Sequence, residues 1–397
     1  MPSFSRVLIA LAVLAVPVTV RAQPATEEVP RQPPGWVFTP SVGFGGTWDD
    51  NLLLASEGDP RLKDYGTPVD SGLTLAYRGR RLNLSGSYGG SFVMYRTYDE
   101  VNSASQRARV YLEHRATSRL KVFAEENYID APSTDALNLA GVPFYRTGSR
   151  TNEAGGGIEA LLARHTTLVA GYVLRSVAFD AQVGQQLQDG HEHEWRVSLA
   201  RAHTPHLTIG VQYDLRHEVL SNPDDRFNIQ QAGATVEYAL TPRVTVSGVL
   251  GVAVLGAGLT QDGSIGPAIE TQLLYHARDT RLSASYQRTF VPSFGFGGTF
   301  QNEEWVGNVH VPIGSSRVYV ESSLAWFDND PIESGQPSLQ SVWLSGTGGY
   351  RASRWLTLEV YARRTSQNAQ RPGGNVRRSD IGFRVVVTKP MRIRAVV

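Results

Sequence analysis

Runs in which apolar and polar side chains alternate recur along this chain from Trp36 almost to its end. In residues 82–92, Leu, Gly, Tyr and Phe fall on one face, while Asn, Ser and one Gly fall on the other. This alternation is typical of a β-strand with one apolar face. The runs commonly reach ten residues, longer than the roughly five or six usual in soluble sheets and close to the roughly 9 to 11 of a strand that crosses a bilayer. The pattern therefore predicts an all-β fold, a transmembrane antiparallel up-and-down β-barrel.

The connections between the runs are of two kinds, which alternate along the chain. Short turns are expected near residues 79–81, 117–119, 164–166, 204–206, 241–243, 278–280, 314–316 and 352–354. Longer loops are expected over residues 49–66, 97–104, 130–149, 180–192, 217–227, 256–266, 291–302, 328–339 and 365–377. Eight turns and nine loops make 17 connections, which predicts about 18 strands. In an outer-membrane barrel the short turns and both termini are periplasmic and the long loops are extracellular.

The N-terminus has the features of a secretory signal. Arg6 precedes an apolar stretch at residues 7–20, and Val20-Arg21-Ala22 fits a signal-peptidase site. The stretch is shorter than the roughly 20 residues of a membrane-spanning helix and contains Pro17, which argues against an uncleaved anchor. Residues 1–22 are therefore predicted to be a signal peptide.

The predicted barrel occupies residues 36–390, with a short segment on either side. Residues 23–35 are polar and rich in proline, which favours an extended periplasmic tail. Residues 380–387 resemble the strand signal that barrel-assembly machinery recognises, but the chain continues past it. Because Pro390 cannot donate a hydrogen bond to a ladder, residues 391–397 are predicted to form a short C-terminal tail rather than part of a central strand.

Composition and motifs exclude several classes of protein. The 38 Lys and Arg nearly equal the 37 Asp and Glu, which argues against a nucleic-acid partner. The chain has no cysteine, so it forms no disulfide. No catalytic or nucleotide-binding motif occurs, and we predict no enzyme activity, no cofactor and no metal. A hydrolase with a Ser/His or Asp/His set on the barrel rim is the less favoured alternative.

Three clusters of ligand-type residues have a simpler explanation than metal binding. His191-Glu192-His193-Glu194 would place both histidines on one face of a strand, where a transition metal could bind. A solvated junction between loop and strand explains this run better, because no third ligand is evident. Asp49-Asp50-Asn51 and Pro223-Asp224-Asp225 could bind calcium through oxygens, but they also fit ordinary turns.

Charged residues of both signs fall on the polar face of the predicted strands. A charge that faced lipid would cost about 2 to 4 kcal/mol at mid-bilayer, so these residues should face a lumen. The pore-lining candidates are Arg78, Arg107, Arg109, Glu113, Arg115, Glu159, Arg196, Arg216, Glu237, Glu270, Glu321, Arg351, Glu359, Arg363 and Arg384. Two interpretations remain open: the charges pair into structural ladders, or the arginines guide solutes that carry carboxylates or phosphates.

The first strand carries a family resemblance. Residues 43–51, Gly-Phe-Gly-Gly-Thr-Trp-Asp-Asp-Asn, end a strand in an aromatic residue followed by Asp-Asp-Asn before a long loop. This element, with residues 70–77 and the strand through Tyr88 and Tyr95, resembles the outer-membrane β-barrel porin family associated with exopolysaccharide production and export. The resemblance implies a role as a porin or in polysaccharide transport, with no catalytic residues.

The sequence thus predicts a pore in the outer membrane of a Gram-negative-type bacterium, for polysaccharide export or for small polar or anionic solutes. An occluded barrel that serves as a structural or binding component of an envelope polysaccharide assembly is the alternative. The expected partners are outer-membrane lipid, barrel-assembly machinery and either the polysaccharide or export-complex proteins.

Overall fold

The computed structural model describes residues 35–180, 187–221, 224–259, 262–314, 317–333, 335–369 and 374–394. The predicted signal peptide and all but the last residue of the predicted Pro-rich tail lie outside these residues. The described helices are two short 3₁₀ turns, η1 (Asp99–Val101) and η2 (Thr134–Ala136). Neither is long or apolar enough to cross a membrane.

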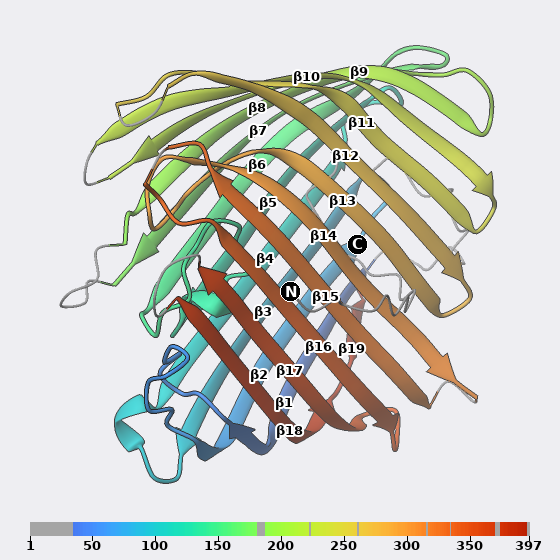
Figure 1. The fold of residues 1–397 in the computed structure, drawn as a ribbon. Coiled ribbons are helices and arrows are strands. Elements are labelled where there is room, and N and C mark those ends of the chain that lie inside the picture. Colours follow the sequence, from blue (N-terminus) through green and yellow to red (C-terminus); the bar gives the residue numbers. More distant parts are fainter. Residues whose placement is uncertain are drawn as a thin grey trace.

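The described residues otherwise form long antiparallel strands (Figure 1). The strands are β1 (Gly35–Asp49), β2 (Asp64–Arg78), β3 (Leu82–Tyr95), β4 (Ser103–Arg115), β5 (Leu120–Ala131), β6 (Ser149–Ala163), β7 (Thr166–Phe179), β8 (Gly190–Ala202), β9 (Leu207–Leu220), β10 (Asp225–Thr241), β11 (Val244–Leu255), β12 (Ser264–Ala277), β13 (Thr280–Pro292), β14 (Thr299–Ile313), β15 (Val318–Pro331), β16 (Leu339–Arg351), β17 (Leu356–Ala369), β18 (Asn375–Thr388) and β19 (Met391–Arg394). Short turns and generally longer loops alternate between β1 and β18, which confirms the predicted order of connections.

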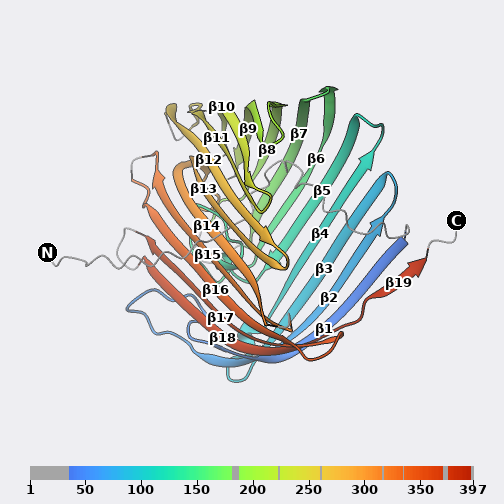
Figure 2. The same cartoon turned by 90° about the vertical axis from the view of Figure 1, so that its right-hand side faces the viewer.

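The sheet closes on itself. Each strand from β1 to β17 pairs with the next, and β1 also pairs with β18 in a ladder from Ser41↔Thr388 to Asp49↔Asp380. The result is a closed, 18-stranded antiparallel barrel, as predicted (Figure 2). The four residues of β19 follow Pro390 and pair with the first residues of β1. The segment expected as a C-terminal tail therefore begins with a short strand that extends the seam.

Large apolar side chains cover the outward face. Val42 and Phe44 of β1 are exposed, and so are Ile381 and Phe383 on the neighbouring strand of the seam. Tyr350 is exposed in the same way near the short-turn end of its strand. A continuous apolar surface of this extent is unfavourable in water. This face is therefore suited to an apolar environment.

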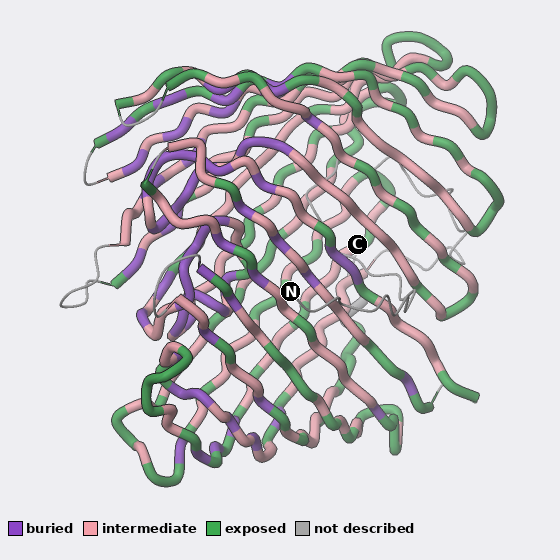
Figure 3. Tube along the Cα trace, in the orientation of Figure 1, coloured by how far each residue is buried: buried purple, intermediate pink, exposed green. Residues whose placement is uncertain are grey.

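Buried residues collect inside the barrel at the end that carries the longer loops (Figure 3). The largest apolar cluster includes Leu220, Phe227, Phe290 and Phe294, all at most 3% exposed. Two of these residues come from the end of β13 and the loop that follows it. Strand ends and the longer loops together therefore build a small hydrophobic core within the barrel.

Candidate functional site: a charged lumen with a loop plug

All 15 predicted pore-lining residues lie on strands, on the face opposite the outward apolar side chains. Most form ion pairs along the inner wall. Arg363 of β17 contacts Asp380 of β18 at 3.0 Å, and Arg196 of β8 contacts Asp214 of β9 at 2.6 Å. Arg384 of β18 pairs with Glu359 of β17. The wall is thus cross-linked by charges, as one of the two sequence interpretations expected.

The two partners of these ion pairs are not equally accessible. The side chain of Arg363 is 59% exposed and that of Asp380 is 12% exposed; for Arg109 and Glu125, 4.0 Å apart, the values are 61% and 20%. Arg384 is 41% exposed and its partner carboxylate is 11% exposed. In these three pairs the guanidinium group extends into the lumen while the carboxylate is shielded beneath it.

Four of the predicted residues make no side-chain hydrogen bond or ion pair with the described part of the chain: Arg78, Arg107, Glu237 and Glu270. Arg107 lies on β4, and its guanidinium group is near another positive charge, that of Arg363. Glu237 and Glu270 lie on β10 and β12, across the barrel from β1, β2 and β18 (Figure 1). Arginines and glutamates without a direct ion-pair partner among the described residues thus lie on different sides of the interior.

The loop of residues 132–148 leaves β5 and attaches to the wall formed by β16, β17 and β18. Trp343 Nε1 of β16 donates to the carbonyl of Asp135 at 2.8 Å, and both carboxylate oxygens of Asp135 accept from Arg378 Nη1 of β18 at 3.2–3.3 Å. Gln367 of β17 accepts from the backbone N–H of Phe144 at 2.8 Å. These contacts carry the loop across the lumen.

A second loop, residues 293–298 after β13, contacts the first loop. Ser293 Oγ donates to the carbonyl of Gly141 at 3.3 Å, and Gly295 exchanges two backbone hydrogen bonds of 3.1 Å with Gln188. Gly295 has a φ of +116°, a conformation that side chains with a Cβ rarely adopt. We name residues 132–148 and 293–298 together the loop plug.

Positive charge also gathers where the loop plug meets the wall. Arg146, in the first loop, donates from Nη2 to the carbonyl of Val101 at 2.9 Å. Burial, followed by the positive charge of Arg378, lowers the pKa of Arg146 below its usual value. Arg378 is itself held by Asp49 at 2.7 Å and by Asp135. This part of the plug is therefore rich in guanidinium groups.

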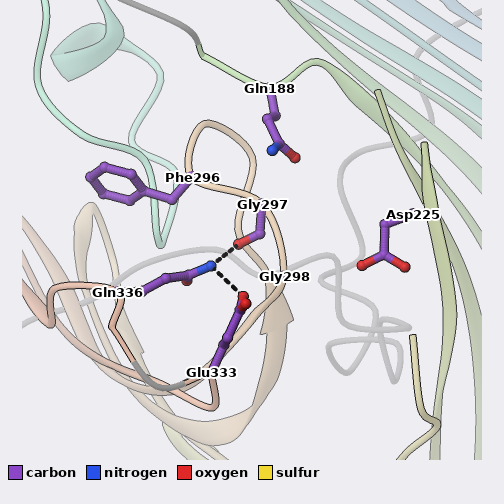
Figure 4. Close-up of a pocket in the computed structure, with 7 residues that line it drawn as sticks. All are labelled: Gln188, Asp225, Phe296, Gly297, Gly298, Glu333 and Gln336. Carbon is purple, nitrogen blue, oxygen red and sulfur yellow. Dashed lines mark hydrogen bonds between the residues drawn. The ribbon is translucent and has the colours of Figure 1, made fainter. Parts of the chain in front are cut away.

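A small recess opens between the loops, lined by Gln188, Asp225, Phe296, Gly297, Gly298, Glu333 and Gln336 (Figure 4). Gln336 Nε2 donates to the carbonyl of Gly297 at 3.2 Å and to Glu333 at 2.8 Å. The Asp225 carboxylate accepts from the backbone N–H of Leu259 at 2.6 Å. These bonds between neighbouring side chains and backbone are of the kind that fill gaps between loops.

The ligand-type clusters have structural roles. Asp49 accepts from the backbone N–H of Asn51 at 3.0 Å and also binds Arg378, while Asp50 accepts from Ser379 N–H at 2.6 Å. Asp224 pairs with Arg226 at 3.0 Å, and residue 223 lies outside the described part of the chain. The first of these clusters therefore ties the loop after β1 to β18.

The His191–Glu194 run alternates about the wall. The rings of His191 and His193 lie 5.5 Å apart on the outward face, while Glu192 faces inward and contacts Arg175. In the described ranges, no group of three or more histidine or acidic side chains is arranged to hold a metal ion. No histidine there hydrogen-bonds a serine either, so no Ser/His pair is assembled.

Sequence reasoning missed the loop plug and the residues that anchor it. Residues 137–144, Leu-Asn-Leu-Ala-Gly-Val-Pro-Phe, are unusually apolar for a solvated loop, and this composition was the available signal. Which wall the loop would reach depends on Asp135 and on partners more than 200 residues away in the chain. No local pattern reports such a contact.

No family model matches the chain, and no curated protein matches it either. Among solved structures it is similar to OpdQ of Pseudomonas aeruginosa, with 11% identity, a TM-score of 0.43 and coverage of 90% of this chain and 98% of that one. OccAB4 of Acinetobacter baumannii has 10% identity, a TM-score of 0.45 and coverage of 91% and 100%. The siderophore receptor PirA of P. aeruginosa has 10% identity, a TM-score of 0.41 and coverage of 90% and 81%. The family resemblance of residues 43–51 stays a prediction.

Proposed function

We propose that this chain forms a pore in the outer membrane of a Gram-negative-type bacterium that passes small polar solutes and favours anions. The observation that carries this proposal is a closed 18-stranded barrel with an apolar exterior and a charged interior. A cylinder of this strand number is wide enough to hold an aqueous channel. The predicted signal peptide and the alternation of short turns with longer loops support periplasmic termini and extracellular loops.

The preference for anions follows from the arginines whose side chains reach the lumen. Arg109 and Arg363 are more than half exposed, whereas their carboxylate partners are at most one-fifth exposed. Arg107 adds a guanidinium with no carboxylate partner among the described residues. A planar guanidinium with free N–H groups binds carboxylate or phosphate in a bidentate geometry.

The loop plug favours small solutes over a polymer. A polysaccharide chain would have to displace residues 132–148 from their hydrogen bonds to Trp343 and Gln367. The same plug also supports the second candidate, an occluded barrel that binds partners of an envelope assembly.

The deciding experiment is single-channel recording of the refolded mature protein, residues 23–397, in a planar bilayer under a KCl gradient. We expect steady conductance and a reversal potential that shows anion preference. Replacing Arg107 and Arg363 with Gln should reduce that preference, because two lumenal charges are lost. Arg226→Gln, at the start of β10 and paired with Asp224, is the matched control and should change nothing.

Two results would contradict the proposal. A folded, heat-modifiable barrel that passes no current would overturn the pore and favour the occluded barrel. Conductance with cation preference would keep the pore and remove the assignment of anionic solutes.

A further inference from the structure

One row of inward side chains crosses five neighbouring strands at the long-loop end of the barrel. The register places Glu153 of β6, Arg175 of β7, Glu192 of β8, Glu218 of β9 and Phe227 of β10 side by side. Directly paired residues on one face of a sheet have Cβ atoms about 4.5–5.5 Å apart. Two carboxyl groups, those of Glu192 and Glu218, are therefore immediate neighbours with no cation between them.

Both carboxyl groups are removed from water. Glu192 is 1% exposed and Glu218 is 0% exposed. Oε2 of Glu192 and both side-chain oxygens of Glu218 have no hydrogen-bond partner. An apolar cluster that includes Phe227 and Phe294 lies beside the pair. Two ionised carboxylates are strongly disfavoured in such a site, because each lacks hydration and repels the other.

The cations around the pair do not compensate for two negative charges. Arg175 contacts Glu192 at 2.9 Å but also contacts Glu153 at 2.8 Å, so its charge is shared. Arg216 of β9 is 4.0 Å from Glu192. Its Nη2 donates instead to the carbonyl of Phe290 at the end of β13, at 2.9 Å.

Arg196 also acts on Glu192 electrostatically, but it is already paired with Glu194 and Asp214. β10 contributes the uncharged Phe227 to the row, and the end of β13 contributes Phe290 with its backbone carbonyl. A proton held between the two carboxyl groups removes one charge and satisfies an oxygen on each side.

We propose that Glu192 and Glu218 share one proton, and that this proton keeps the second loop of the plug, residues 293–298, closed against β9. The link to the loop is Arg216, which bonds to Phe290 only three residues before that loop begins. When the proton leaves, a second buried negative charge attracts Arg216 away from Phe290 and draws in water. The carbonyl of Phe290 then loses its hydrogen bond to Arg216, and the apolar cluster that includes Phe294 loses its packing against the wall.

The absence of cysteine from the chain makes a direct test simple. Ser293→Cys places a near-isosteric thiol at a residue that is 0% exposed in the second loop. Its rate of reaction with a water-soluble maleimide is measured between pH 5 and pH 9 in the refolded full barrel. Asp59→Cys, in an exposed part of the loop after β1, corrects for the ordinary effect of pH on thiol reactivity.

We expect the corrected rate at residue 293 to rise with pH while the shared proton is being lost, by at most about tenfold per pH unit, and to level off once the proton has left. Glu218→Gln, which cannot ionise, should keep labelling slow across the whole range. Glu237→Gln, an inward carboxyl on the same side of the barrel, should leave the rise unchanged.

A corrected rate that does not change with pH would overturn the proposal. A rise that persists in Glu218→Gln would do the same, and so would loss of the rise in Glu237→Gln. If Glu218→Gln fails to fold, the same labelling is measured in Glu192→Gln, which also leaves the pair with a single carboxyl group, and a rise that persists there would overturn the proposal. Because labelling reports the loop and not current, these outcomes do not depend on whether the barrel conducts.

Discussion

Asp135 joins two parts of the molecule that are far apart in sequence. Its carboxylate accepts hydrogen bonds from Ser133 Oγ at 2.6 Å and from Arg378, and its backbone carbonyl accepts from Trp343. The residue is 6% exposed, so these contacts form in a poorly hydrated site where charge-assisted hydrogen bonds are strong. One side chain thereby holds the start of the loop plug on the opposite wall.

Asp135→Asn should loosen this attachment without unfolding the barrel, because Arg378 keeps its contact with Asp49. A neutral amide in place of the carboxylate should cost about 1–3 kcal/mol of local stability. Faster proteolysis within residues 132–148, with unchanged heat-modifiability of the barrel, is the expected result. Asp180→Asn, which removes an exposed ion pair with Arg150, is the control and should have no effect.

Unchanged proteolysis in Asp135→Asn would mean that the other contacts of the loop, including its hydrogen bonds to Trp343 and Gln367, are sufficient to hold it.

At the scale of strands, alternation was a reliable guide because an 18-stranded barrel divides every strand into an outward and an inward face. It failed where a strand end lies against protein on both sides. The end of β13 is such a place: Thr289 and Phe290 are adjacent in sequence yet 1% and 2% exposed. The charges of the wall were visible in the sequence, but their unequal exposure depends on cross-strand register, which single runs do not report.

The pairing of β1 with β18, which closes the barrel, leaves no space for a side chain at Gly45. A Cβ at this position would overlap the backbone carbonyl oxygen of Phe383. Gly45→Val should therefore prevent normal closure, and the product should lose the mobility shift of a folded barrel on unheated gels. Gly346→Val, also within a strand but with no atom within 4 Å of the added Cβ, is the matched control and should fold.

Normal folding of both glycine variants would show that the seam can shift its register, in which case the close approach at Gly45 is not required for closure.

At the scale of the whole molecule, barrel and plug are stabilised separately. The barrel depends on a continuous ladder of hydrogen bonds from β1 to β18, and no strand of that ladder belongs to the plug. The plug depends on side chains such as Gln367 and on the apolar cluster that contains Leu137 and Val142. The sequence predicted the ladder because apolar and polar residues alternate within each strand and can be read from neighbouring positions. The plug is made by contacts between segments that are far apart in the chain.

Removal of the first loop should therefore open the lumen and leave the barrel intact. Ala131 and Ser149 are register partners across β5 and β6, so a four-residue Gly/Ser turn can replace residues 132–148 without moving either strand. We expect a folded barrel with larger single-channel conductance and passage of larger sugars, because the segment that crosses the lumen is gone. The control replaces residues 256–263 in the same way between the partners Leu255 and Ser264. Unchanged conductance in both variants would show that residues 132–148 do not set the size of the pore, and loss of folding in the first alone would show that the plug supports the barrel wall.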